Sequence, residues 1–249
     1  MKKLFFAAIA VLTLWGCGDS SKDTDITDTD VTDETVNWGD IPDGENDVYQ
    51  YFIQEFIVPS KVEVKKPASE LYLDVSGDSF YTTKKDHPSF KKAKELAEFY
   101  GDTSYNRENL PFANSPLAYP IDKITICCDK DFDTEHPAGK PLDDVVKLEF
   151  ETFYEYVKNG YEIPDNIPHE NRKGNEKVAH LLNFEDINAE VATLVEIFPF
   201  NGQMIKVTPI IHFASAPAEP GEYNFVLETT INGKVFKSEF AYTFERESE

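Results

Sequence analysis

The clearest alternation of apolar and polar residues lies near the carboxyl end of the chain. Between residues 221 and 245, two alternating runs flank Asn232-Gly233, a dipeptide that strongly favours a two-residue β-hairpin turn. With that turn the pairing register is set, and Phe225 lies opposite Phe240. We therefore predict a hairpin with one apolar face and one polar face, as a layer of a β-sandwich requires.

Several other stretches have the β-branched and aromatic content of strands. They are residues 48–64, with a break expected at Pro59, and residues 71–75, 80–81, 121–128, 145–150 and 193–198. The run 203–213 is expected to add a third strand to the hairpin sheet, and Pro209 places that strand at an edge or a bulge.

One segment changes from a strand period to a helical period. Residues 87–100 carry apolar side chains at helical spacing. Asp86 is expected to cap the helix, Pro88 suits its first turn, and Gly101 follows as a stop signal. We predict an amphipathic helix that packs on a sheet through Phe90, Ala93, Leu96, Ala97 and Tyr100.

The segments between these elements give weaker signals. A short helix is expected within residues 152–160, a surface loop over 161–178, and a helical turn within 181–191. Together the elements predict a mainly β fold, an immunoglobulin-like β-sandwich with a helical insertion, and an α+β fold is the alternative. Residues 47–249 are expected to form a single β-rich domain, with residues 192–249 as its closing strands.

The amino end has the pattern of an export signal. Lys2 and Lys3 precede a run of apolar residues that ends in Leu14-Trp15-Gly16-Cys17. This run is too short to cross a bilayer, which takes about 20 residues. Its end resembles the bacterial lipobox, which implies that residues 1–16 are removed and that Cys17 carries the lipid. An ordinary secretory signal that contains a cysteine is the alternative.

A polar segment follows the signal. Residues 17–46 are rich in Thr and Asp and contain almost nothing to bury, so we predict a disordered acidic tether. Removal of Lys2 and Lys3 leaves 22 basic and 46 acidic residues, a net charge of −24. This charge excludes nucleic acid as a partner, because binding to phosphates needs a basic surface.

The cysteines and histidines carry little information about chemistry. With Cys17 lipidated, only Cys127 and Cys128 remain, and neighbouring cysteines rarely pair because the ring is strained. Strand alternation places at most one of the two thiols in the core. The five histidines share no metal-ligand spacing, and no nucleophile elbow or phosphate loop occurs. No catalytic residue is predicted.

One acidic run is a candidate metal site. Asp129, Asp131 and Asp133 alternate directly after a predicted strand, and alternating aspartates can surround a calcium ion. Thr134 and Lys140 occupy the positions at which an EF-hand has its glycine and its closing glutamate. A solvated acidic loop without any cofactor is therefore the alternative to calcium binding.

Two stretches resemble a known class of proteins. SPLAYPIDKITICCDKDFDTEHPAGKPLDDVV (residues 115–146) and PGEYNFVLETTINGKVFKSEF (residues 220–240), together with the lipobox and the tether, resemble uncharacterised surface lipoproteins of the Bacteroides type. The second stretch is similar to the closing hairpin of their immunoglobulin-like modules. The resemblance implies a lipid-anchored protein of the outer membrane, with display at the cell surface or residence in the periplasm as the two alternatives, and it carries over no functional residue except Cys17.

These observations favour a non-catalytic binding or structural module that is held at the membrane by its lipid and binds a protein or a glycan. A small extracytoplasmic hydrolase that uses an acidic cluster is one alternative, and two carboxylates with separated pKa values in a cleft would favour it. A surface filament subunit is another, and it would exchange strands at an exposed sheet edge.

Overall fold

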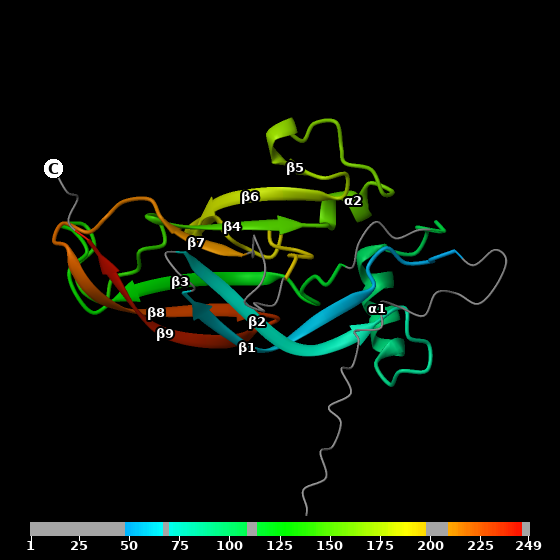
Figure 1. Ribbon diagram of the computed structural model, residues 1–249, viewed down its shortest axis with the longest axis horizontal. Helices are drawn as coiled ribbons and strands as arrows, with labels where there is room; N and C mark the ends of the chain where they lie inside the picture. Colours follow the sequence, from blue (N-terminus) through cyan, green and yellow to red (C-terminus); the bar gives the residue numbers. More distant parts are fainter. Residues whose placement is uncertain (1–47, 67–69, 109–113, 198–208, 246–249) are drawn as a thin grey trace, which may run out of the picture. The chain divides into compact units, whose positions relative to one another are not determined.

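The computed structural model describes residues 48–66, 70–108, 114–197 and 209–245, all within the compact unit formed by Trp38–Glu249. The predicted signal peptide, Cys17 and the predicted tether lie outside these residues, so those predictions remain predictions. In the described residues the chain is mainly β, with two antiparallel sheets and few helices (Figure 1). The α+β alternative is wrong.

The larger sheet contains six strands in the order β1-β2-β7-β4-β6-β5. Their bounds are β1 Glu55–Lys65, β2 Leu71–Tyr81, β7 Ile210–Phe213, β4 Val146–Thr152, β6 Lys177–Asn183 and β5 Arg172–Lys173. The smaller sheet has the order β3-β8-β9, with β3 Ile121–Cys128, β8 Gly221–Ile231 and β9 Lys234–Phe244. The helices are α1 Phe90–Tyr100, α2 Tyr154–Lys158 and the short 3₁₀ turns η1 His169–Asn171 and η2 Phe184–Asp186.

The predicted hairpin is confirmed, together with its register. β8 and β9 pair from Ile231 opposite Lys234 outward, and Phe225 lies opposite Phe240. Their rings stack with centroids 5.3 Å apart. Alternate side chains of β8 are buried, so the apolar face looks into the core as the pattern predicted.

The prediction for the strand before the hairpin is wrong about its partner. β7 lies in the middle of the larger sheet, between β2 and β4, and the third strand of the hairpin sheet is β3. Ile210 and Ile211 are both buried, which suits an internal strand covered on both faces. Pro209 lies just outside β7, and its carbonyl accepts a hydrogen bond from Leu73.

β1 and β2 are longer than predicted. Pro59 does not break β1 but marks a register shift before Lys61. β2 runs without interruption through Gly77, where two short strands had been expected. A Cβ atom at Gly77 would lie 1.9 Å from the Val58 carbonyl oxygen, so the glycine lets the two backbones approach closely instead of ending the strand.

The amphipathic helix is confirmed, with a different start. α1 begins at Phe90, so that Ser89 and not Asp86 occupies the capping position, and no side chain caps its amino end. Gly101 adopts the left-handed conformation at φ 79°, and its N–H bonds the carbonyls of the last turn. Ala93, Ala97 and Tyr100 are buried, so the apolar stripe packs inward as predicted.

Four predictions between residues 152 and 198 have mixed outcomes. The short helix is present as α2, and η2 supplies a helical turn. The predicted loop 161–178 contains β5 and the start of β6, and β6 extends to Asn183. Residues 193–197 form only isolated bridges, not a strand. The secondary structure of this region follows from the pairing of β6 with β4, because a partner strand and not local propensity determines whether such short segments form strands.

The core has two main parts among the described residues. The larger part lies between the two sheets, and side chains such as Val62, Leu148, Ile126 and Phe225 reach it from both. The smaller part lies under α1 and α2, around Phe52. Packing of two sheets face to face makes the fold a β-sandwich with a helical insertion.

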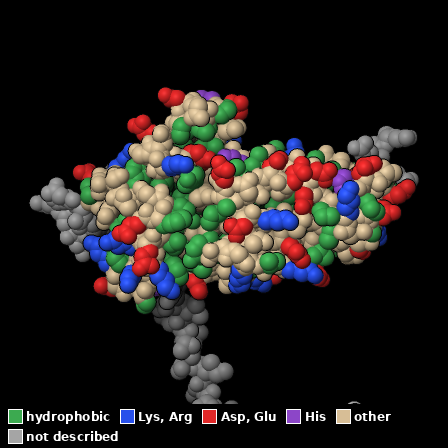
Figure 2. Space-filling model, turned by 180° about the vertical axis from the view of Figure 1, so that it is seen from behind, with side chains coloured by type: hydrophobic (Ala, Val, Ile, Leu, Met, Phe, Trp, Pro, Cys, Tyr) green, Lys and Arg blue, Asp and Glu red, His purple; other side chains and the backbone are tan. Residues whose placement is uncertain are grey.

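The surface mixes charges of both signs. Figure 2 shows Asp and Glu side chains interspersed with Lys, Arg and hydrophobic ones, so on this face the net negative charge is not gathered in one patch. Among the helices of the described residues, none is long and apolar enough to span a membrane.

Candidate functional site

The predicted acidic loop follows β3, where the sequence placed it, and the protein itself satisfies its first two carboxylates. Asp129 accepts hydrogen bonds from the backbone and side-chain nitrogens of Asn224 at 2.9 and 2.7 Å. These bonds hold the pKa of Asp129 below its ordinary value. Asp131 accepts a hydrogen bond from the backbone of Ala138 at 2.8 Å.

A histidine organises the rest of the loop. His136 is buried, with Nδ1 2.8 Å from Asp133 and Nε2 2.9 Å from Asp144. Burial disfavours the charged ring, but hydrogen bonds to the two carboxylates outweigh it and raise the pKa of His136. The imidazole thus lies between the carboxylates of Asp133 and Asp144, in the stretch where the sequence suggested a calcium ion.

The geometry gives the calcium hypothesis no support. Asp129, Asp131 and Asp133 each bond to protein groups, and in the described part of the chain no three His, Cys, Asp or Glu side chains are placed to hold a metal ion together. Calcium binding at these residues stays a prediction, which a calorimetric titration tests.

The His136 contacts predict a pH dependence of stability. Because the folded-state pKa of His136 is raised, its contribution is fully present below about pH 6.5, the ordinary value for histidine, and is lost as pH rises through the folded pKa. We expect the melting temperature to fall between pH 6 and pH 9 by more in the wild type than in His136→Gln. Equal falls in the two proteins, measured by calorimetry, would contradict this role.

A second cluster of charges lies at the end of β4. The Lys177 ammonium is 2.6 Å from Glu151 and 2.6 Å from Glu196. The side chains of Glu151 and Glu196 are 9% and 4% exposed. Burial raises the pKa of Glu196 to about 7, and Lys177 only partly offsets that rise. Burial opposes the charge on Lys177, but hydrogen bonds to the two glutamates outweigh it and raise its pKa.

This cluster bears on the hydrolase alternative. Two neighbouring carboxylates, one of them with a strongly raised pKa, are what an acid–base site needs. Catalysis also needs access for a substrate, and neither Glu151 nor Glu196 is among the residues that line the cleft described below. The geometry therefore favours an internal ion cluster that joins β4, β6 and residue 196.

The described residues form a cleft between the end of β7 and the end of β9. Its volume is about 400 Å³, within the range of about 300–1,000 Å³ typical of small-ligand sites. Polar and aromatic side chains share its wall. The lining residues are Glu70, Leu71, Ile210, Ile211, His212, Phe213, Ala214, Ser215, Ala216, Tyr242 and Phe244.

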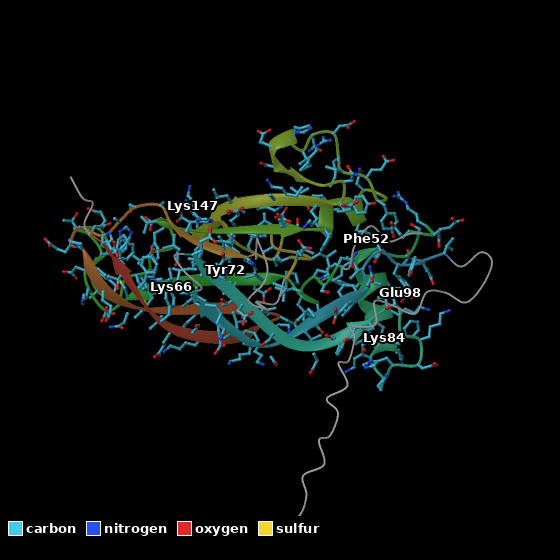
Figure 3. The ribbon with its side chains drawn as sticks, in the orientation of Figure 1. Phe52, Lys66, Tyr72, Lys84, Glu98 and Lys147 are labelled. Atoms are coloured by element: carbon cyan, nitrogen blue, oxygen red, sulfur yellow. The ribbon has the colours of Figure 1, made fainter. Side chains whose placement is uncertain are left out.

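Three half-buried aromatic rings form one wall of this cleft. The ring of Phe213 lies 5.4 Å from that of Tyr242 and 5.0 Å from that of Phe244. Lys66, labelled in Figure 3, places its ammonium 4.4 Å from the centre of the Tyr242 ring. Aromatic faces beside hydrogen-bonding groups such as Ser215 suit a ligand with both apolar and polar surface.

Glu70 and His212 in the cleft already have partners. Glu70 accepts a hydrogen bond from the Tyr72 hydroxyl, and His212 lies 3.0 Å from Glu149. These contacts orient the side chains before any ligand arrives, which lowers the cost of binding.

The sequence did not identify this cleft. By strand alternation Tyr242 lies on the same face of the hairpin as Phe240, but no local signal indicated that β7 would bring Phe213 beside it. The prediction for the cysteines is consistent with the structure, since Cys128 is buried and Cys127 half-buried. Burial raises the pKa of Cys128, which makes its thiol a poor nucleophile.

Comparison of the chain with protein-family models, with curated proteins and with solved structures finds no match.

Proposed function

We propose that this chain is a lipid-anchored, extracytoplasmic protein of the outer membrane that binds a ligand without catalysing a reaction. The lipobox-like run before Cys17 and the acidic segment that follows it support the membrane anchor. The resemblance to Bacteroides-type surface lipoproteins, with an immunoglobulin-like closing hairpin, supports display at the cell surface.

The cleft between β7 and β9 is the observation that supports binding. It combines an aromatic wall with Glu70, His212 and Ser215, whereas the buried carboxylates that could support acid–base chemistry lie elsewhere. A protein side chain or a sugar ring of a glycan fits a cleft of this size and polarity.

Two experiments test the proposal, one for the anchor and one for the cleft. Cells that express the wild type or Cys17→Ser are fed a fatty-acid analogue and then treated with protease. We expect the label and the membrane association in the wild type only, with cleavage of the protein on intact cells. Glycan and peptide arrays are then probed with the wild type, with Tyr242→Ala in the cleft, and with Val235→Ala as a control outside it.

Each outcome has a separate meaning. An unlabelled wild-type protein would refute the anchor, and protection from protease would place the protein on the inner side of the membrane. A ligand whose binding is unchanged in Tyr242→Ala would refute the cleft as its site, because the substitution removes one of the three wall rings.

A further inference from the structure

Tyr49 forms an isolated backbone bridge with Arg107, and the segment that follows it is held mainly by side chains rather than by a strand ladder. Residues 51–54 precede β1 and belong to no strand or helix. Phe52 and Ile53 are almost completely buried, in the part of the core that α1 covers (Figure 3). Because buried backbone groups need partners, other elements must supply them.

Asp102 supplies two of these partners with one carboxylate. Its Oδ1 accepts a hydrogen bond from the Phe52 N–H and its Oδ2 one from the Ile53 N–H, both at 2.8 Å. The Tyr161 hydroxyl donates to Oδ1 at 3.0 Å and holds the carboxylate in place. Asp102 is 0% exposed, and hydrogen bonds to a charged group are stronger in such a site than at the surface.

Asn114 and Thr82 hold the same segment from the other side. Asn114 accepts a hydrogen bond from the Gln54 N–H and donates one to the Phe52 carbonyl, both at 2.8 Å. The Thr82 hydroxyl donates to the Ile53 carbonyl, and its backbone N–H donates to the Gln54 carbonyl at 2.9 Å. We call Asp102, Asn114 and Thr82 the entry clamp.

We propose that the entry clamp is the junction at which force on the membrane tether enters the folded domain, and that it keeps residues 51–54 from being pulled out of the core. This inference rests on the proposed function, because only an anchored chain is pulled from this end. The predicted tether ends at residue 46, a few residues before the clamped segment.

The arrangement suits that role. Asp102 bonds two successive N–H groups and Asn114 bonds residues 52 and 54, so extraction must break these bonds together rather than one after another. Without the clamp, force would act directly on Glu55, the end of the β1–β2 ladder, whose pairs can open in sequence.

Pulling single molecules of the full chain between an amino-terminal and a carboxyl-terminal handle tests the inference. In the wild type we expect residues 51–54 to leave only when the domain unfolds. In Asp102→Asn we expect these residues to leave in a separate, earlier step that lengthens the chain by about 14 Å for four residues. Their release should be roughly ten- to a hundredfold faster than in the wild type, since each lost bond to a charge is worth about 1.5–3 kcal/mol.

Two further variants complete the test. Asp122→Asn is the matched control, because Asp122 also accepts a backbone hydrogen bond, but from Gly233 in the β8–β9 turn and not from residues 51–54. Thr82→Val removes one donor at little change in volume and carries the test if Asp102→Asn does not fold. In Thr82→Val the hydrogen-exchange rate of the amides of residues 52–54 should rise about tenfold, while that of the β8–β9 amides stays unchanged.

An early step in the wild type, or identical first steps in the wild type and in the folded clamp variants, would overturn the inference. Because the handles replace the lipid, this outcome is independent of Cys17. Failure of fatty-acid labelling would instead refute the proposed anchor and leave the measured strength of the clamp intact.

Discussion

Replacement of Lys177 by methionine is expected to lower the free energy of unfolding by about 3–5 kcal/mol. The substitution leaves the carboxylates of Glu151 and Glu196 in place without the ammonium that lies 2.6 Å from each. Both carboxylates are buried, so solvent cannot replace the lost charge. Removal of one member of a buried ion cluster is costly for this reason.

Urea unfolding at pH 7 measures the effect. Lys237→Met is the matched control, because Lys237 is 53% exposed and pairs with exposed Glu239, an arrangement worth about 0–1 kcal/mol. The double variant Lys177→Met with Glu196→Gln is expected to recover part of the loss, since it removes one buried acid. A loss in Lys177→Met as small as in the control would show that the cluster does not stabilise the fold.

Replacement of Phe132 by alanine is expected to cost about 3–5 kcal/mol. Phe132 belongs to the acidic loop, yet it is 0% exposed. Its ring lies 6.1 Å from Phe213 and 5.8 Å from Phe244, two residues that line the cleft. The loss of this side chain removes the aromatic contacts between the loop and the sandwich and leaves a cavity behind the aromatic wall.

Thermal and urea unfolding of Phe132→Ala beside Phe99→Ala checks this prediction. Phe99 is 77% exposed, so the control should change stability by no more than about 0.5 kcal/mol. Phe132→Ala should also weaken any ligand found for the cleft, because Phe213 and Phe244 lose their support. Equal stabilities of the two variants would mean that the loop folds independently of the core.

In the acidic loop, the sequence identified the carboxylates but not the groups that bond to them. The alternation of Asp129, Asp131 and Asp133 was visible, but the groups that satisfy them come from elsewhere. Asn224 lies on β8, and Asp144 is near in sequence without any pattern that links it to His136. Local spacing identifies groups that could bind an ion, whereas only the fold shows which protein groups already occupy that position.

The sequence by itself determined the elements whose signals are local. The Asn232-Gly233 turn set the register of β8 and β9, and helical spacing with Gly101 set α1, because turn chemistry and side-chain periodicity act over a few residues. The tertiary structure alone decided that β7 joins the larger sheet, that Asp102 holds residues 52 and 53, and that Glu151, Glu196 and Lys177 meet. These contacts join residues 19 to more than 100 positions apart, and their partners are chosen by burial and hydrogen-bond satisfaction in the assembled core.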